Sequence, residues 1–226
     1  MTDTSHIDML AVRDRKRTMV SGLNDMYLEN FRQTGAEFIL GSGRFVGSKT
    51  LEVTLADGVT RRVRGANVIV STGTRAASEP IPGLSDAQPL THIEALELDV
   101  VPRHLIVIGG GYVGLELSQA MSRFGSKVTV IDQNDRLLHL EDDDVTSGLA
   151  SLFIHEGIDT VLNARVKNIS GRSGTAVTVV VDQGGREKTL VGTHLLVATG
   201  RRPNTENIGL ELAVDCPMFC TSEELV

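Results

Sequence analysis

Three glycines between residues 105 and 132 have the spacing that phosphate binding requires. In LIVIGGGYVGLELSQAMSRFGSKVTVID, Gly109, Gly111 and Gly114 fit G-x-G-x-x-G between an apolar run and an amphipathic stretch. Such glycines permit a tight turn, close approach of a pyrophosphate, and close packing of helix on strand. The helix start adds unpaired amide donors and a positive dipole. A purely structural glycine-rich turn is the alternative, but the flanking elements favour a dinucleotide site.

The acid that ends this segment indicates which dinucleotide binds. Asp132 follows the second strand, where a carboxylate accepts hydrogen bonds from the adenosine ribose and repels a 2′-phosphate. We therefore expect NAD(H) to bind more tightly than NADP(H). Gln133 and Asn134 come next and carry no positive charge, whereas Arg136 is close enough in sequence to reach a phosphate and reverse the preference.

The elements around the motif predict an α/β domain. Strands and helices alternate through HLIVI, residues 112–124, KVTVID and residues 145–156, which implies a parallel sheet with right-handed crossovers. An antiparallel excursion with a turn at Gly184 follows, before a last buried strand over residues 195–198. We expect a Rossmann-like dinucleotide-binding domain over residues 91–201.

Residues 1–90 have a different pattern. Residues 7–34 have helical periodicity, and four β-branched runs indicate a meander of short strands: EFILGSGRFV, TLEVTL, TRRVRG and NVIVSTG. Asp57 and Gly58 are a hairpin signal between the second and third runs. The segment SEPIPGLSDAQP is rich in Pro and Gly and indicates a linker, with a domain boundary between Pro89 and Pro102.

Composition excludes several classes of protein. The 226 residues are 41% hydrophobic, which is enough for a core, and the net charge of −7 and the absence of Trp argue against a nucleic-acid surface. The basic run RDRKR at residues 13–17 is interpreted as a solvated helix face. The start MTDTSHIDML resembles neither a signal peptide nor a membrane anchor, so we expect a cytoplasmic protein.

Other reactive side chains are given structural interpretations. Cys216 and Cys220 are interpreted as two reduced thiols, since no further cysteine or suitably spaced histidine completes a metal site. The acids of HLEDDD at residues 139–144 are expected in the first turn of the next helix and not around a metal. The scattered histidines lack a nucleophile partner for a hydrolase triad.

Three segments in order resemble the flavoprotein pyridine nucleotide-disulfide oxidoreductases, which include dihydrolipoamide dehydrogenase, glutathione reductase and mercuric reductase. They are VIVSTGTRAASEPIPG, HLIVIGGGYVGLELSQAMSRFGSKVTVID and LLVATGRRPNTENIGLE, and the resemblance extends to about Glu211. It implies hydride transfer between NAD(H) and flavin, with FAD and NAD as cofactors. The residues it assigns to cofactor binding are Thr72, Gly73, Gly109, Gly110, Gly111, Tyr112, Val113, Gly114, Asp132, Val166, Ala198, Thr199, Gly200 and Arg201.

The resemblance also implies individual roles. Thr72 and Gly73 would lie against FAD, the four residues from Ala198 would close over NAD(P), and Val166 would contact the adenine through its backbone. Tyr112 would be an aromatic lid at the nicotinamide, and Glu116 would help to orient that ring. A surface-packing tyrosine and a solvated helical acid are the alternatives for these last two.

The sequence departs from the family at both ends. The first flavin-binding glycine motif, a Cys-x-x-x-x-Cys disulfide and a C-terminal dimerisation domain are not found in it, so we expect a truncated member. Residues 1–90 would be part of the flavin domain, and residues 202–226 the start of a return to it. Two functions follow: an FAD-dependent NAD(P)H oxidoreductase present as a fragment that binds FAD weakly or not at all, or a non-catalytic NAD(H)-binding remnant.

Overall fold

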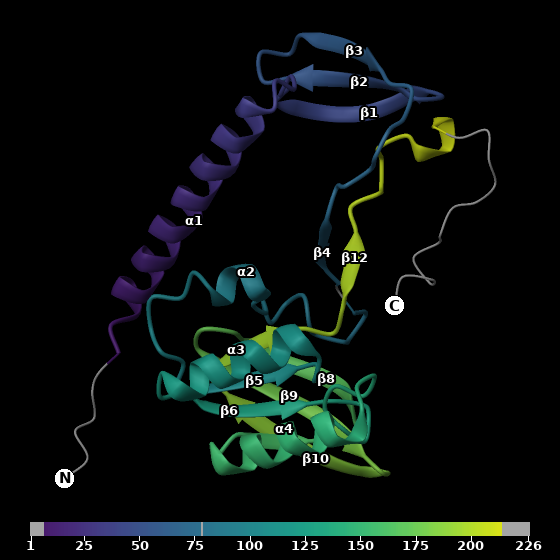
Figure 1. Ribbon diagram of the computed structural model, residues 1–226. Helices are drawn as coiled ribbons and strands as arrows, with labels where there is room; N and C mark the ends of the chain where they lie inside the picture. Colours follow the sequence, from purple (N-terminus) through teal and green to yellow (C-terminus); the bar gives the residue numbers. More distant parts are fainter. Residues whose placement is uncertain (1–6, 78, 214–226) are drawn as a thin grey trace. The chain divides into compact units, whose positions relative to one another are not determined.

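The computed structural model describes residues 7–77 and 79–213, which divide into two compact units (Figure 1). The first unit comprises residues 1–17 and 76–200, and the second comprises residues 18–75 and 201–226. Each unit is described by itself.

A parallel sheet lies at the centre of the first unit. Its order is β11-β5-β6-β7, formed by His194–Val197, His104–Ile108, Lys127–Ile131 and Asp159–Val161. All neighbouring pairs are parallel. The strands β5, β6 and β11 are nearly continuous runs of buried residues, as expected when both faces of a sheet are covered.

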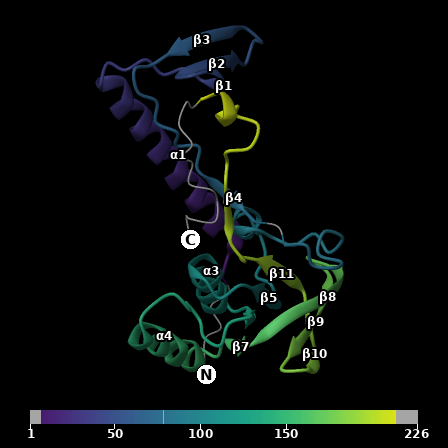
Figure 2. The same ribbon diagram turned by 90° about the vertical axis from the view of Figure 1, so that its right-hand side faces the viewer.

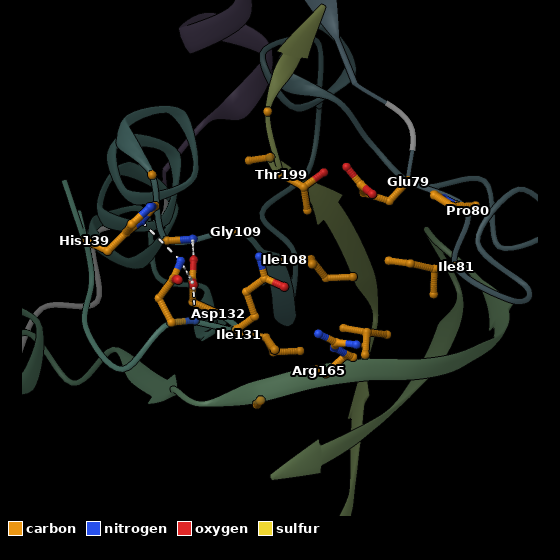
Figure 3. Close-up of a pocket in the computed structure, with 18 residues that line it drawn as sticks. Glu79, Pro80, Ile81, Ile108, Gly109, Ile131, Asp132, His139, Arg165 and Thr199 are labelled. Atoms are coloured by element: carbon orange, nitrogen blue, oxygen red, sulfur yellow. Dashed lines mark hydrogen bonds between the residues drawn. The ribbon is translucent and has the colours of Figure 1, made fainter. Parts of the chain in front are cut away.

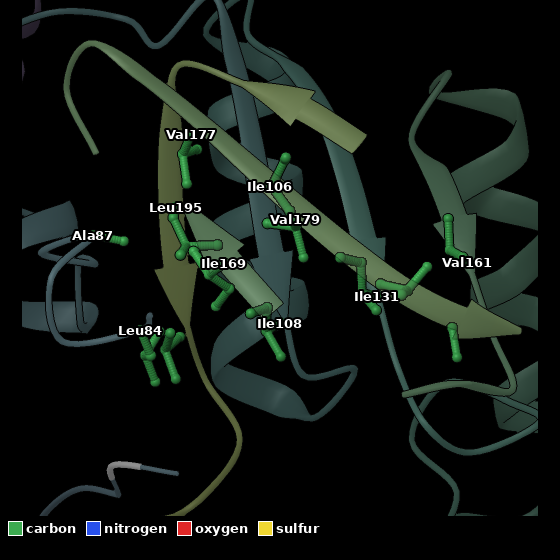
Figure 4. Packing of buried hydrophobic residues seen from close by; sticks show 13 residues of the cluster. Leu84, Ala87, Ile106, Ile108, Ile131, Val161, Ile169, Val177, Val179 and Leu195 are labelled. Atoms are coloured by element: carbon green, nitrogen blue, oxygen red, sulfur yellow. The ribbon is translucent and has the colours of Figure 1, made fainter. Parts of the chain in front are cut away.

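An antiparallel sheet covers one face of the parallel sheet. Its order is β10-β9-β8, formed by Arg186–Gly192, Ala176–Gln183 and Ala164–Arg172. The turn from β9 to β10 passes through Gly184 and Gly185, which both have positive φ, so the predicted turn is confirmed. Alternate residues of β9, Val177 and Val179 among them, are buried against Ile106 and Leu195 (Figure 4).

Helices cover the other face. Figure 2 shows α3 (Tyr112–Arg123) and α4 (Asp143–His155) on the side of the parallel sheet away from β8, β9 and β10. Leu115 and Met121 of α3 and Phe153 of α4 pack on Val128 and Val130 of β6. The short helix α2 (His92–Ala95) adds Ala95 to this second core. The predicted α/β class, with its antiparallel excursion, is confirmed.

The proline- and glycine-rich segment before Pro102 is part of the first unit. Leu90 forms a parallel bridge with Leu196, and Leu84 and Ala87 are buried in the core between the two sheets. Its interpretation as a linker is therefore wrong, because its apolar side chains complete that core. The compact unit resumes at Ala76, and the division by function at residue 90 remains a prediction.

The first turns of α1 (Met9–Gln33) also belong to the first unit. Arg17 and Lys16 form ion pairs with Glu97, the former through Nη2 at 2.5 Å, and Arg13 Nη1 lies 3.6 Å from Asp99. The basic run is thus not simply a solvated face. The sequence could not reveal this, because its acidic partners lie some eighty residues further along the chain.

The second unit contains the rest of α1 and a three-stranded antiparallel meander. The strands are β1 (Gly41–Gly47), β2 (Thr50–Leu55) and β3 (Thr60–Arg64), with the expected turn at Gly58, whose φ is 83°. The predicted fourth strand in NVIVSTG is wrong: no strand forms over residues 67–73, and Ile69 is 91% exposed. β-propensity alone does not make a strand without a partner to pack on.

Two short strands and a 3-10 helix complete the second unit. Strand β4 (Thr74–Ala76) pairs with β12 (Arg201–Pro203), side by side in Figure 1, and η1 (Leu210–Leu212) follows. Of the helices within residues 7–77 and 79–213, none has both the length and the apolar character to cross a bilayer.

Candidate functional site

Two of the motif glycines are explained by contacts within the protein. A Cβ on Gly109, whose φ is 112°, would lie 2.3 Å from the carbonyl oxygen of Ala198. A Cβ on Gly114 would lie 2.2 Å from the carbonyl oxygen of Gly109. These two glycines therefore let β5, β11 and α3 pack at van der Waals distance.

Gly111 is different, because no described residue other than its chain neighbours fills the space beside it. A Cβ there would have no described atom within 4 Å, and its φ of −89° is open to any residue. Neither packing nor backbone geometry requires glycine at this position. A missing side chain at the start of a helix leaves room for a ligand to reach the backbone.

Gly110 already uses both of its backbone groups. Its N–H donates to Oδ2 of Asp132 at 2.5 Å, and its carbonyl accepts from the N–H of Leu138 at 3.0 Å. The N–H groups at the start of α3 lack intrahelical partners, as at every helix start, and the N-cap Gly111 has no side chain to cap them. The donors for an anion are therefore those of Gly111, Tyr112 and Val113.

Asp132 is held in place by its neighbours. Its Oδ1 accepts from the backbone N–H of Asn134 at 2.7 Å, an Asx turn, and from the Asn134 side chain at 2.9 Å. Arg136, the residue that could recruit a 2′-phosphate, is not among the described residues that line the cavity. It pairs with Asp143 and donates to the carbonyl of His139 at 3.1 Å.

Gly109, Gly110, Gly111, Asp132 and Asn134 border a cavity of about 600 Å³ at the carboxyl ends of β5, β6 and β11 (Figure 3). The hydroxyl oxygen of Thr199 is buried and has no hydrogen-bond partner among the described residues. An unpaired buried hydroxyl is costly, so it marks a place where a bound polar group would be stabilising. The lining is Glu79, Pro80, Ile81, Ile108, Gly109, Gly110, Gly111, Ile131, Asp132, Gln133, Asn134, His139, Ala164, Arg165, Val166, Ala198, Thr199 and Gly200.

Eight of the residues predicted from the sequence line this cavity. They come from four separate stretches of the chain: Gly109, Gly110, Gly111, Asp132, Val166, Ala198, Thr199 and Gly200. Tyr112 and Val113 contribute backbone N–H groups beside it, and Gly114 packs beneath the loop. Their roles in binding remain predictions.

Two predicted side chains on α3 are exposed. The Tyr112 hydroxyl donates to Glu141, and this hydrogen bond raises the pKa of the tyrosine above its usual range. Glu116 is exposed one turn further along α3. The lid and orienting roles remain predictions.

The predicted flavin contacts belong to the second unit. The carbonyl of Thr72 accepts from the Asn204 side chain at 3.1 Å, and that of Gly73 accepts from the Asn204 backbone at 2.9 Å. Arg201 donates to the hydroxyl and carbonyl of Thr74 at 2.6 and 2.8 Å. Its predicted dinucleotide contact is therefore not supported by the cavity, which ends at Gly200 among the described lining residues.

Sequence reasoning missed several lining residues. His139 opens the acidic run HLEDDD and Arg165 precedes the predicted Val166, but neither belongs to a binding motif in the sequence. Glu79, Pro80 and Ile81 lie in the segment whose composition predicts a linker. The run from Glu79 to Pro82 carries a weak signal, since two prolines flanking an isoleucine indicate an extended segment that can lie along a sheet.

The described residues offer no candidate metal site. Within the described chain there is no group of three or more His, Cys, Asp or Glu side chains that could hold a metal ion. Of the acids in HLEDDD, Asp143 and Asp144 lie in the first turn of α4 as predicted, whereas Asp142 is its N-cap and Glu141 precedes the helix. Cys216 and Cys220 lie outside the described residues, so their interpretation as reduced thiols stays a prediction.

Comparison with known proteins supplies the context for this geometry. The family model for pyridine nucleotide-disulphide oxidoreductases matches residues 6–218. A mitochondrial dihydrolipoyl dehydrogenase from Dictyostelium discoideum is 34% identical over 208 residues, and a mercuric reductase from Streptomyces lividans is 33% identical over 206 residues. Each match covers 91% of this chain and 43% of the relative, so the chain spans less than half the length of these proteins.

Solved structures agree. The HOCl-induced flavoprotein disulfide reductase RclA from Escherichia coli superposes with a TM-score of 0.78 at 29% identity. LpdA from Mycobacterium tuberculosis superposes with a TM-score of 0.79 at 29% identity. Both matches cover 92% of this chain and 46% of the solved chain.

Proposed function

The chain belongs to the pyridine nucleotide-disulphide oxidoreductase family, and we propose that its first compact unit binds NAD(H) for hydride exchange with a flavin. One observation carries the proposal: the protein fills the space at Gly109 and Gly114 but leaves it open at Gly111, on the wall of the cavity. That vacancy, beside unpaired helix N–H groups, fits a pyrophosphate.

The proposed pose follows from the polar groups around the cavity. The pyrophosphate accepts from the N–H groups of Gly111, Tyr112 and Val113, and a polar group of the dinucleotide pairs with the buried hydroxyl of Thr199. The adenosine ribose hydroxyls donate to Asp132. Since Arg136 is engaged with Asp143, the nearest cation in sequence does not offset the repulsion of a 2′-phosphate, and NAD(H) is preferred over NADP(H).

The flavin part of the proposal rests on the family and on Thr72 and Gly73. FAD, when bound, accepts hydride from the nicotinamide and passes electrons to an acceptor. The carbonyls of Thr72 and Gly73 accept from Asn204, and Gly73 has a φ of 69°, a conformation that glycine adopts without strain. These two residues offer a small contact, so we expect FAD to bind this chain weakly.

The test uses two glycine variants with the same added side chain. Gly111→Val should weaken NADH binding by roughly a hundredfold, because two branched carbons then occupy the pyrophosphate position, while the melting temperature stays close to that of the native chain. Gly148→Val is the matched control, since Gly148 lies in α4 with nothing within 4 Å of an added Cβ. Fluorescence titration with NADH measures both. Native-like affinity in a folded Gly111→Val variant would refute the site.

The alternative of binding without turnover differs only in the flavin step. NADH oxidation by a dye, measured with and without added FAD, separates the two. Oxidation that depends on FAD supports the oxidoreductase, whereas NADH binding without such oxidation supports the NAD(H)-binding remnant.

A further inference from the structure

Asn134 joins Asp132 to His139 at the edge of the cavity. Nδ2 of Asn134 lies 2.9 Å from Oδ1 of Asp132 and 3.1 Å from Nδ1 of His139. All three residues line the cavity, and Figure 3 shows their hydrogen bonds as dashed lines. They form one hydrogen-bonded row, called here the Asp132–Asn134–His139 row.

This row specifies the protonation state of His139. A carboxylate oxygen only accepts hydrogen bonds, so the Asn134 atom that faces it is the donor nitrogen of the amide. The same nitrogen faces Nδ1 of His139, which must therefore accept and carry no proton. A neutral imidazole has one acceptor nitrogen and an imidazolium has none, so the row as it stands requires neutral His139.

We propose that His139 is a positioning residue that makes the preference for NAD(H) over NADP(H) depend on pH. The inference rests on the proposed NAD(H) site. Histidine is the side chain whose charge generally changes between pH 5 and 8. When Nδ1 gains a proton, Asn134 loses this acceptor, while Asp132 keeps the backbone N–H donors of Asn134 and Gly110. The new positive charge also lies on the side of the cavity where Asp132 meets the ribose.

The added charge affects the two dinucleotides differently. A cation beside Asp132 reduces the repulsion of a 2′-phosphate, which strengthens NADPH binding. NADH has no phosphate at this position, so its binding changes less. The preference for NADH therefore narrows as the pH falls.

The other charged groups around His139 do not supply this change. Carboxylates and guanidinium groups generally keep their charge between pH 5.5 and 8.5, so histidine is the group in this set that changes. Arg136 donates to the carbonyl of His139 and is paired with Asp143. Asp132, Glu79 and Arg165 line the same cavity, and the loop around His139 also carries Asp135, Glu141 and Asp142.

The experiment measures dissociation constants for NADH and NADPH by fluorescence from pH 5.5 to 8.5. We expect the ratio of the NADPH constant to the NADH constant to fall by roughly fivefold toward pH 5.5, at the low end of typical couplings between sites. The 2′-phosphate of NADPH also changes its charge in this range. The ratio of dissociation constants is therefore compared between the native protein and each variant at the same pH. His139→Gln keeps an acceptor for Asn134 and no charge, so its ratio should stay high. His139→Lys has a charge and no acceptor, so its ratio should be low throughout.

His155→Gln in the last turn of α4 is the control and should follow the native protein. If His139→Gln has the same pH profile as the native protein, the inference is overturned while the NAD(H) site stands. If His139→Lys and His139→Gln have equal ratios at pH 8.5, it is overturned in the same way. A native chain that binds NADH at no pH would overturn the proposed function and this inference together.

Discussion

The two ends of the parallel sheet treat their polar groups in opposite ways. At the carboxyl ends, the hydroxyl of Thr199 is buried without a described partner, and the space beside Gly111 is empty. At the amino ends, Nε2 of His104 lies 2.9 Å from the hydroxyl of Thr129, and Nδ1 of His194 lies 3.1 Å from that of Thr193. The polar groups named at the amino ends pair with one another, whereas those at the carboxyl ends are where the proposed dinucleotide would bind. Of the four buried side-chain atoms without a partner among the described residues, the Thr199 hydroxyl lines the cavity and the others belong to Arg13, Ser118 and Glu156. An unpaired buried atom therefore points to a site only where open space lies beside it.

The strongest test of this comparison adds a methyl group where the protein is already full. Gly114→Ala places a Cβ 2.2 Å from the carbonyl of Gly109, which forces β5 and α3 apart. We expect a loss of about 3 kcal/mol or more in the free energy of unfolding, at the upper end of overpacking costs. Urea denaturation measures it. Gly148→Ala is the control and should be stabilising by up to about 1 kcal/mol, because this helical glycine has open space around it. A Gly114→Ala protein of native stability would contradict the packing.

The next test removes one acceptor at the ligand end. Asp132→Asn should weaken NADH binding by about 2 kcal/mol, because hydrogen bonds to a charged group contribute roughly that much. NADPH binding should change less, since the repulsion of its 2′-phosphate is relieved at the same time. Titration of both dinucleotides gives the comparison, and Asp135→Asn, an exposed acid in the same loop, is the control. Equal losses for NADH and NADPH would argue against a ribose contact.

Most of the fold was predictable, because its signals are local. The alternation of strands and helices after residue 103, the turn at Gly184 and the acids opening α4 all depend on neighbours within a few residues. The failures depend on distant partners. The NVIVSTG segment lacks a neighbouring strand, and RDRKR meets Glu97 and Asp99 only in the folded protein.

The residues of the candidate site also divide into those with a local sequence signal and those that depend on distant partners. The glycine motif and Asp132 could be found because their spacing carries the mechanism. Arg165 and Glu79 reach the cavity from segments with no motif, and His139 is linked to the site by a side-chain contact with Asn134, five residues earlier. Such residues become visible only when the sheet brings their segments together.

The two histidines at the amino ends of the strands predict how the stability of the protein depends on pH. Burial lowers the pKa of His104 and of His194 below the usual range, with a smaller contribution from Lys127 at His104. The unfolded chain therefore binds more protons than the native protein as the pH falls below about 6.5, so the free energy of unfolding decreases with decreasing pH. Above that pH both states are neutral and the dependence disappears.

The measurement is the free energy of unfolding, by urea denaturation, of the native protein and of His104→Gln between pH 5 and 8. We expect the pair of histidines to lower the free energy of unfolding by about 1 kcal/mol over this range, and the variant to lose part of that slope. Carboxylates contribute equally to both proteins, so the difference between the two profiles belongs to His104. Parallel profiles would show that His104 takes up its proton equally in both states.

The smallest effect is expected from replacing a threonine by valine, once on each side of the comparison. Thr199→Val removes a buried hydroxyl that has no described partner, so the free energy of unfolding should stay equal or rise by up to about 1 kcal/mol, while NADH binding weakens by a similar amount. Thr129→Val removes a paired hydroxyl and leaves Nε2 of His104 without its partner, so stability should fall by about 1 kcal/mol with NADH affinity unchanged. Denaturation measures the change in stability of each variant, and NADH titration measures the change in affinity. Thr199→Val should lose affinity but not stability, and Thr129→Val should lose stability but not affinity. If Thr199→Val loses stability without losing affinity, its hydroxyl has a partner inside the protein, and the proposed contrast between the two ends of the sheet fails.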